Sequence, residues 1–241
     1  MIFDKITPRE VNGNHYVWIP KFYFRASEVF YISEEPVGEM ELHPAFMRNG
    51  DVLDGFYVGA YECSADEATG GICIAPNQKP IVGENKITFK RRIQNSDMHC
   101  VNIYERIAVL TLALFETTTA TRSLQESFGN GDNIQDARLI ANTGTTNNVY
   151  RGIHELWANT HEYVETSRNN RVLTPGTLDD FSMSKSSFKM YTNRLCNVNY
   201  PLNNSTFDYS PNSFCRNSFN PWMNNLSNVA LSGYRVVWDG D

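Results

Sequence analysis

The sequence predicts an α+β fold with few helices, many short antiparallel strands and much irregular loop. Short runs of β-branched and aromatic residues recur between turn dipeptides, a pattern typical of strands. Residues 101–115 are apolar on most sides and predict one buried helix. The tract 193–228 holds eleven asparagines, which compete with the backbone for hydrogen bonds and favour irregular loops. We find neither an internal repeat nor a linker, so we predict a single domain over residues 1–241.

Composition and charge limit the classes of function. A hydrophobic fraction of 41% over 241 residues is that of a folded globular protein. The formal charge of -6 argues against a nucleic-acid partner, because phosphate neutralisation needs clustered lysine and arginine, and the basic cluster at 90–92 is short. No apolar run approaches the roughly 20 residues of a membrane span, so we expect no membrane insertion. The cysteines, odd in number and widely spaced, match neither a disulfide framework nor a zinc site.

The first part of the chain predicts strands. Residues 15–25 and 29–33 are rich in β-branched and aromatic residues and predict a strand or hairpin. Residues 56–62 alternate as a strand after two turn dipeptides. The stretch 64–86 is rich in Gly, Pro, Asn and Lys and predicts an exposed connection, and 87–93 predicts another short strand.

The clearest helix lies in the middle of the chain. Its apolar residues extend from Val101 to Phe115, and Ser96 or Asp97 can cap its start. We expect it to end near residues 117–119, where β-branched side chains accumulate.

Beyond this helix the local patterns are weaker. Residues 120–150 are loop-like, and the periodicity of 151–165 leaves helix and strand open. The polar stretch 166–192 suits a hairpin, and the closing run 233–238 is rich in strand-forming residues.

Three blocks carry a resemblance to a known fold. They read HPAFMRNGDVLDGFYVGAYE at 43–62, RGIHELWANTHEYVE at 151–165 and GYRVV at 233–237. In this order they resemble the C-type-lectin-like fold of formylglycine-generating enzymes and bacteriophage tail proteins, in which the middle block reads close to RGIxxLWGNxWEWVDG and the last strand reads GFR or GYR. The segment 102–125 resembles the phage branch in particular. The resemblance implies one C-type-lectin-like domain of the formylglycine-generating-enzyme type.

The same resemblance implies structural roles for matched residues. Asn159 and Glu162 are candidates for buried polar groups that bond loop backbones. Ala158, His161 and Tyr163 depart from the family pattern at a Gly and two Trp positions, which changes details of the buried aromatic network but not the topology. The residues to which we assign structural roles are Trp157, Asn159, Glu162, Gly233, Tyr234 and Arg235.

We expect residues 191–228 to form ligand-binding loops. Aromatic rings supply contact area and Asn amides supply adaptable hydrogen bonds, so their mixture here suits a recognition surface. In the phage branch that the chain resembles, a diversity-generating retroelement often alters the C-terminal part by copying errors at adenines, which leaves an Asn-, Ser-, Tyr- and Phe-rich tract before a fixed GFR-like end. The expected ligand-binding residues are Tyr191, Asn193, Asn197, Asn199, Tyr200, Asn203, Asn204, Phe207, Tyr209, Asn212, Asn217, Phe219, Asn220, Trp222, Asn224 and Asn225.

An enzyme is the less favoured hypothesis. Formylglycine-generating enzymes, which the chain also resembles, use two C-terminal cysteines five residues apart that bind copper. Here Ser210 and Asn220 stand five residues before and after Cys215, so the cysteine pair is absent. We therefore expect no catalytic residue and no cofactor, and a copper oxidase is our third choice.

Our first hypothesis is a phage tail or other virion-surface protein that binds a host-surface receptor, a glycan or a protein, through these loops. The alternative is a structural tail or capsid decoration protein, with aromatic residues buried against neighbouring subunits. Virion proteins are commonly symmetric, so we expect a homo-oligomer that also contacts other virion proteins. The opening residues lack the order of a signal peptide, so we expect synthesis in the host cytoplasm and a place in the virion. Calcium ligands without EF-hand spacing are available at Asp132, Asp136, Asp179 and Asp180.

Overall fold

The α+β class is confirmed for the part of the chain that the computed structural model describes. This part comprises residues 1–26, 30–48, 50–117, 140–145, 149–156, 159–163, 167–168, 171–172, 214–216 and 232–240. It contains two α-helices and mostly short antiparallel strands. Within these ranges no helix has both the length and the apolar character needed to cross a membrane.

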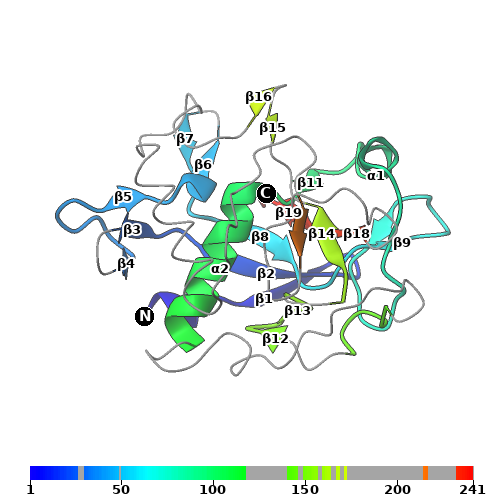
Figure 1. Ribbon diagram of the computed structural model, residues 1–241, viewed down its shortest axis with the longest axis horizontal. Helices are drawn as coiled ribbons and strands as arrows, with labels where there is room; N and C mark the ends of the chain where they lie inside the picture. The colour runs from blue at the N-terminus through cyan, green and yellow to red at the C-terminus, as the bar shows by residue number, and fades with distance from the viewer. Residues whose placement is uncertain are drawn as a thin grey trace, which may run out of the picture.

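A five-stranded antiparallel sheet forms the centre of the described part (Figure 1). In spatial order its strands are β1 (Pro8–Val11), β2 (Asn14–Pro20), β8 (Gly55–Gly59), β19 (Val236–Trp238) and β11 (Met98–Cys100). The late strand β19 pairs with β8 on one side and with β11 on the other. The closing β-rich run is therefore part of the main sheet, as the sequence predicts.

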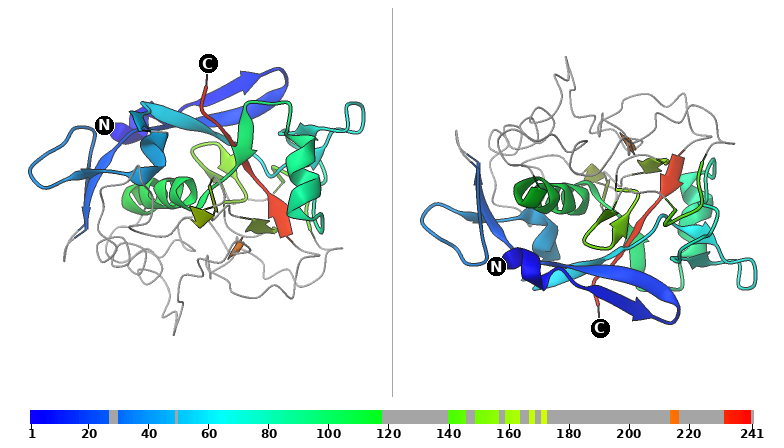
Figure 2. Two further views of the ribbon diagram at one scale, coloured as in Figure 1. Left: turned by 90° about the horizontal axis from the view of Figure 1, so that it is seen from above. Right: turned by 90° about the horizontal axis from the view of Figure 1, so that it is seen from below.

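Helix α2 (Ile103–Thr117) lies against one face of this sheet (Figures 1 and 2). Its buried side chains, Ile107 among them, form one core cluster with inward-facing residues of the sheet, such as Val17, Val58 and Val237. The helix ends at Thr117, within the predicted limits. Burial on most sides explains why its sequence is apolar nearly all round.

The cap of this helix differs from the prediction of Ser96 or Asp97. The side chain of Asn102 accepts hydrogen bonds from the backbone N–H groups of Tyr104 and Glu105, at 2.9 and 3.1 Å. The carboxylate of Glu105 in turn accepts from the backbone N–H of Asn102 at 2.7 Å. This reciprocal pair is a capping box, and it fixes the start of α2 six residues later than predicted from Ser96.

The strand predicted at 87–93 is wrong, because residues 87–92 belong to helix α1 (Lys86–Arg92) and Ile93 caps its end. Asn85 caps this helix by accepting from the N–H of Thr88 at 2.9 Å. The basic residues at 90–92 lie in its last turn, where their positive charge interacts favourably with the negative end of the helix dipole. Figure 2 shows the red strands near the C-terminus between α2 and α1.

The stretch 64–86 is more than the exposed connection that its composition predicts. It contains the strands β9 (Ser64–Ala65) and β10 (Ile72–Cys73). Ile74 and Ile81 are buried with α1 residues in a second core cluster. These isoleucines stand alone among turn-forming residues, so the average composition of the stretch does not indicate that they are buried.

The remaining elements are short hairpins and turns. The strands predicted at 15–25 and 29–33 are confirmed by β2, β3 and β4, and the hairpin predicted within 166–192 is confirmed by β15 and β16. The block 151–165 contributes strands rather than a helix in its described residues. These further elements are η1 (Ile2–Lys5), β3 (Tyr23–Ala26), β4 (Phe30–Ser33), β5 (Glu41–Leu42), η2 (Pro44–Phe46), β6 (Met47–Arg48), β7 (Asp51–Val52), β12 (Val149–Tyr150), β13 (Ile153–His154), β14 (His161–Tyr163), β15 (Ser167–Arg168), β16 (Arg171–Val172), β17 (Phe214–Arg216) and β18 (Ser232–Tyr234).

Candidate functional site

A small three-stranded sheet shows where the asparagine-rich tract is attached. We call β17, β14 and β18, in this spatial order, the loop anchor (Figure 1). Strand β17 is antiparallel to β14, whereas β18 is parallel to it. Arg216, the last residue of β17, and Ser232, the first of β18, both pair with His161. The chain therefore leaves at 216 and returns at 232 at the same end of the anchor, about 10 Å apart, which is two strand spacings.

The predicted ligand-binding residues themselves, from Tyr191 to Asn225, lie outside the described residues, and so does Trp157. The four aspartates considered for calcium lie outside them as well. The other predicted structural residues are described, and all five belong to the loop anchor or adjoin it in the sequence.

Glu162 on β14 holds two arginine side chains in the interior. Its Oε1 accepts from Nε of Arg235 at 2.5 Å, and its Oε2 lies 2.7 Å from Nη1 of Arg106 on α2. Glu162 and Arg235 are both 0% exposed. Arg235 also donates to the carbonyl oxygens of Gly59 and His154, each at 2.8 Å. One guanidinium therefore ties the loop anchor to the central sheet and to β13.

Glu62 holds the start of β14 from the other side. Its Oε2 accepts from the side-chain amide of Asn159 at 2.6 Å, and its Oε1 accepts from the N–H and hydroxyl of Thr160 at 3.2 and 2.5 Å. Asn159 Oδ1 accepts from the N–H of Ala141 at 2.8 Å. The φ of Asn159, 67°, is left-handed, a conformation that Asn tolerates better than most residues. Together these contacts fix how the chain enters β14.

A third carboxylate, that of Glu155, is also buried in this region and accepts from the N–H of Gly144 at 2.9 Å. Burial raises the pKa of Glu62 to about 8; the negative charges of Glu162 and Glu155 act in the same direction, and Arg235 opposes them. We call the five charged residues the buried ion cluster: Glu62, Arg106, Glu155, Glu162 and Arg235.

Gly233 and Tyr234 fit the loop anchor for steric reasons. A Cβ on Gly233 would lie 2.5 Å from Oγ1 of Thr160, so a glycine is needed there. Tyr234 is buried, stacks on the ring of Phe89 at 3.9 Å and donates its hydroxyl hydrogen to the carbonyl of Glu84 at 2.6 Å. Both residues bring β18 into close contact with its neighbours.

The chain matches no protein-family model and no curated protein. The geometry of its own residues therefore carries the functional argument. Our sequence reasoning missed Glu62 and Arg106. A signal was present for Arg106, because a charged residue inside an otherwise apolar helix needs a buried partner.

A second cluster joins four segments near the start of α2. Arg48 binds Glu105 on one side and both carboxylate oxygens of Asp239 at 3.0 Å on the other. His99 Nε2 lies 2.8 Å from Glu105 Oε1. We call these four residues the clasp. Burial alone would favour the protonated form of Glu105, but His99 and Arg48 outweigh it and lower its pKa to about 2.

The clasp also contains the one group of potential metal ligands found among the described residues. Donor atoms of His99, Glu105 and Asp239 lie within 4.8 Å of one another. The guanidinium of Arg48, however, already bonds both carboxylates, as a metal cation would. The carboxylates of this donor set are thus already bonded by an internal cation in an ion-pair network.

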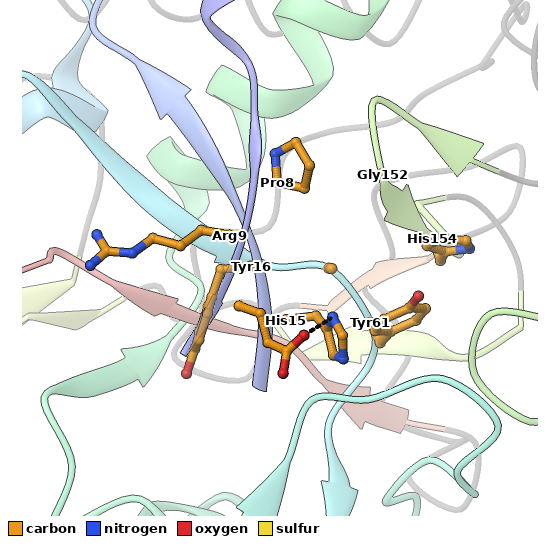
Figure 3. Close-up of a pocket in the computed structure, with 9 residues that line it drawn as sticks. Pro8, Arg9, His15, Tyr16, Tyr61, Gly152 and His154 are labelled. Atoms are coloured by element: carbon orange, nitrogen blue, oxygen red, sulfur yellow. Dashed lines mark ion pairs between the residues drawn. The ribbon is translucent and has the colours of Figure 1, made fainter. Parts of the chain in front are cut away.

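A pocket of about 320 Å³ opens beside the β1–β2 hairpin (Figure 3). His15, Tyr61 and His154 line one wall, with ring centroids 5.8 Å apart for the first pair and 4.6 Å for the second. Glu10 lies 3.9 Å from the His15 ring, too far for a hydrogen bond. Arg9 turns away and donates to the hydroxyl of Tyr57 at 2.9 Å. The pocket therefore presents rings and a carboxylate, which does not suit an anionic ligand.

Proposed function

We propose that this chain is a C-type-lectin-like protein of a phage tail or another part of the virion surface, and that it binds a host-surface receptor through the loops of residues 191–228. The observation that carries the proposal is the loop anchor. Both ends of the segment 217–231 start from one small sheet, on either side of His161. Binding proteins commonly present variable loops from a rigid scaffold in this way.

The buried contacts under the anchor support a scaffold role. Glu162, Arg235 and Arg106 connect β14 to α2 and to the central sheet through ion pairs of 2.5 and 2.7 Å. Burying these charges is favourable only when the partners are held in good geometry, so the network fixes β14 in one position. A fixed base lowers the entropy that a loop loses when it binds.

The composition of the tract supports recognition rather than catalysis. Aromatic rings and Asn amides alternate through residues 191–228, and ionisable groups are scarce. Rings pack on apolar sugar faces as well as on protein surfaces, and amides bond hydroxyls or backbone groups. The proposed ligand is therefore a glycan or a protein on the host surface, bound without turnover by a homo-oligomer that gains avidity from repeated copies.

A loop replacement tests this proposal. We would replace residues 217–231 by a Gly-Ser segment of equal length and measure binding of the purified protein to cells of the host strain by flow cytometry. We expect cell binding to be lost while the urea unfolding midpoint stays close to that of the native chain. The matched control is Glu39→Gln, a change at an exposed residue outside the tract.

The same assay separates the alternatives. Undiminished cell binding by the replaced chain contradicts a role of residues 217–231 in binding. If the native chain ignores cells but binds purified virions, the decoration-protein alternative moves to first place. Sequencing the gene across a population of the same element tests the retroelement step: substitutions should concentrate at Asn-coding adenines between 191 and 228 and not in the helix at 103–117.

A further inference from the structure

The pocket beside the β1–β2 hairpin is lined by polar side chains whose hydrogen-bonding groups are not used by other described residues. The carboxylate of Glu10, the imidazole of His15 and the hydroxyl of Tyr61 make no hydrogen bond within this part of the chain, and the closest approach, between Glu10 and His15, is 3.9 Å. The carboxylates of the clasp, in contrast, are bonded by Arg48. The pocket therefore offers donors and acceptors that a ligand can use.

The backbone behind these side chains is fixed by hydrogen bonds. Glu10 and His15 stand directly opposite each other in the β1–β2 hairpin, so their side chains share one face. The N–H of His15 donates to the carbonyl of Ile74 at 2.8 Å, and its carbonyl accepts from the N–H of Ala60 at 2.9 Å. The N–H of His154 donates to the carbonyl of Ala60 at 2.7 Å. The walls are thus largely preformed, as in most small-molecule sites, which lowers the entropy lost on binding.

The charges around the pocket favour a neutral ligand. Glu10 disfavours an anion, and the guanidinium of Arg9 lies over the ring of Tyr57, with its charge directed away from the pocket. Behind the opposite wall the buried guanidinium of Arg235 donates to the carbonyl of His154 at 2.8 Å, so a positive charge disfavours a cation there. Burial and this charge hold the pKa of His154 below its usual value, so its ring is neutral near neutral pH.

The size and the wall of rings suit a single sugar ring. A volume of about 320 Å³ lies at the lower end of the range of small-molecule sites, roughly 300–1,000 Å³. His15, Tyr61 and His154 follow one another along one wall (Figure 3). Rings provide an apolar surface for the C–H face of a sugar. Sugar hydroxyls both donate and accept, which matches an acceptor-only carboxylate beside an imidazole and a phenol.

We propose that this pocket binds one neutral sugar residue of a glycan. Glu10 and His15 bond its hydroxyl groups from the hairpin, and the wall that contains Tyr61 packs on its C–H face. The site contains no residue of the tract 191–228 and is separate from the loop anchor. It therefore does not rest on the function proposed above.

The test is a titration of the full native chain with the methyl glycosides of glucose, galactose, mannose and N-acetylglucosamine, followed by saturation-transfer and amide NMR. We expect at least one glycoside to bind in the millimolar range and to shift the amides of residues 9–16 and 152–154. Glu10→Ala and His15→Ala should each weaken binding about tenfold, because each removes a hydrogen-bonding group. Glu39→Ala, which removes an exposed carboxylate outside the pocket, is the matched control and should bind like the native chain.

Failure of all four glycosides to bind overturns the proposal. Binding that neither Glu10→Ala nor His15→Ala weakens also overturns it, and the amide shifts of the native chain locate the site even if a variant fails to fold. Tighter binding of adenosine or of tetramethylammonium than of any glycoside overturns the class of ligand. The chain with residues 217–231 replaced should bind the glycoside unchanged, and loss there would overturn the assignment to the pocket. Since cell binding is measured separately, a failure of the receptor proposal stays distinguishable.

Discussion

The buried ion cluster and the clasp both pair arginine with carboxylates, but they differ in how far solvent reaches them. In the cluster, Glu162 and Arg235 are both 0% exposed. In the clasp, His99 and Asp239 are 37% and 35% exposed at the side chain, although the central Glu105 is fully buried. Arginine is the connecting cation in both. The two regions therefore separate the effect of solvent access from the effect of residue type.

The carboxylates of the two regions behave in opposite ways although Glu62 and Glu105 are both buried. At Glu62 the effect of burial exceeds that of the neighbouring positive charge and raises the pKa to about 8. At Glu105 the charges of His99 and Arg48 exceed the effect of burial and lower the pKa to about 2. Glu105, which Arg48 and His99 pair, thus stays ionised even at 0% exposure, whereas at Glu62 burial outweighs the opposing charge of Arg235. The direct charge partner, not burial alone, decides the ionisation state.

The largest expected effect on stability comes from removing Arg235, the central cation of the buried ion cluster. Arg235→Met leaves Glu162 buried with one arginine fewer and removes the hydrogen bonds to Gly59 and His154. We expect a loss of about 3–5 kcal/mol in the free energy of unfolding, measured by urea denaturation. Arg48→Met in the partly exposed clasp should cost less, about 1–3 kcal/mol.

The two arginine variants check each other. Equal losses would show that access to solvent does not matter at these sites, against the comparison. The double variant Arg235→Met/Glu162→Met removes the carboxylate together with this cation, but Arg106 then loses its ion pair with Glu162, so at most part of the loss should be recovered.

What the sequence could predict depends on how local the cause is. The strands at 15–25 and 29–33 and the helix ending at Thr117 follow from patterns within each segment, and all three are confirmed. The strand predicted at 87–93 is wrong because Asn85, just before these residues, caps a helix. The Asn102–Glu105 capping box is also a sequence pattern, but our prediction named only Ser96 and Asp97.

The buried charges could not be predicted in the same way. The Arg235–Glu162 pair joins residues 73 positions apart, and Asn159 meets Glu62 across 97 positions. No local period connects such partners, so only the folded topology brings them together. The resemblance pointed to Asn159, Glu162 and Arg235 as structural residues, yet it left their partners unnamed.

A smaller effect is expected from the close approach of β18 to β14. Gly233→Ala places a Cβ 2.5 Å from Oγ1 of Thr160, which must move and weaken its bond to Glu62. We expect a loss of about 1–3 kcal/mol in urea unfolding. Thr160→Ala removes the obstructing atom at the cost of the same hydrogen bond. The double variant should therefore lose less than the sum of the single losses, and strict additivity would contradict the steric explanation.

The smallest effect concerns the pH dependence of the clasp. Although burial opposes the charged form, Glu105 raises the pKa of His99 above 6.5, so its contribution is full below 6.5 and is lost as the pH rises through the folded value. The contribution of Glu105 is present above 4.5 and is lost as the pH falls through about 2. We expect His99→Gln to remove no more than about 1 kcal/mol of stability near pH 6, because the ring is partly exposed and solvent screens the pair. Urea unfolding at pH 6 and pH 9 measures this, and the variant should approach the native chain at the higher pH. A constant difference between the two would mean that His99 acts by packing alone, and the clasp would then stabilise the fold without responding to protons.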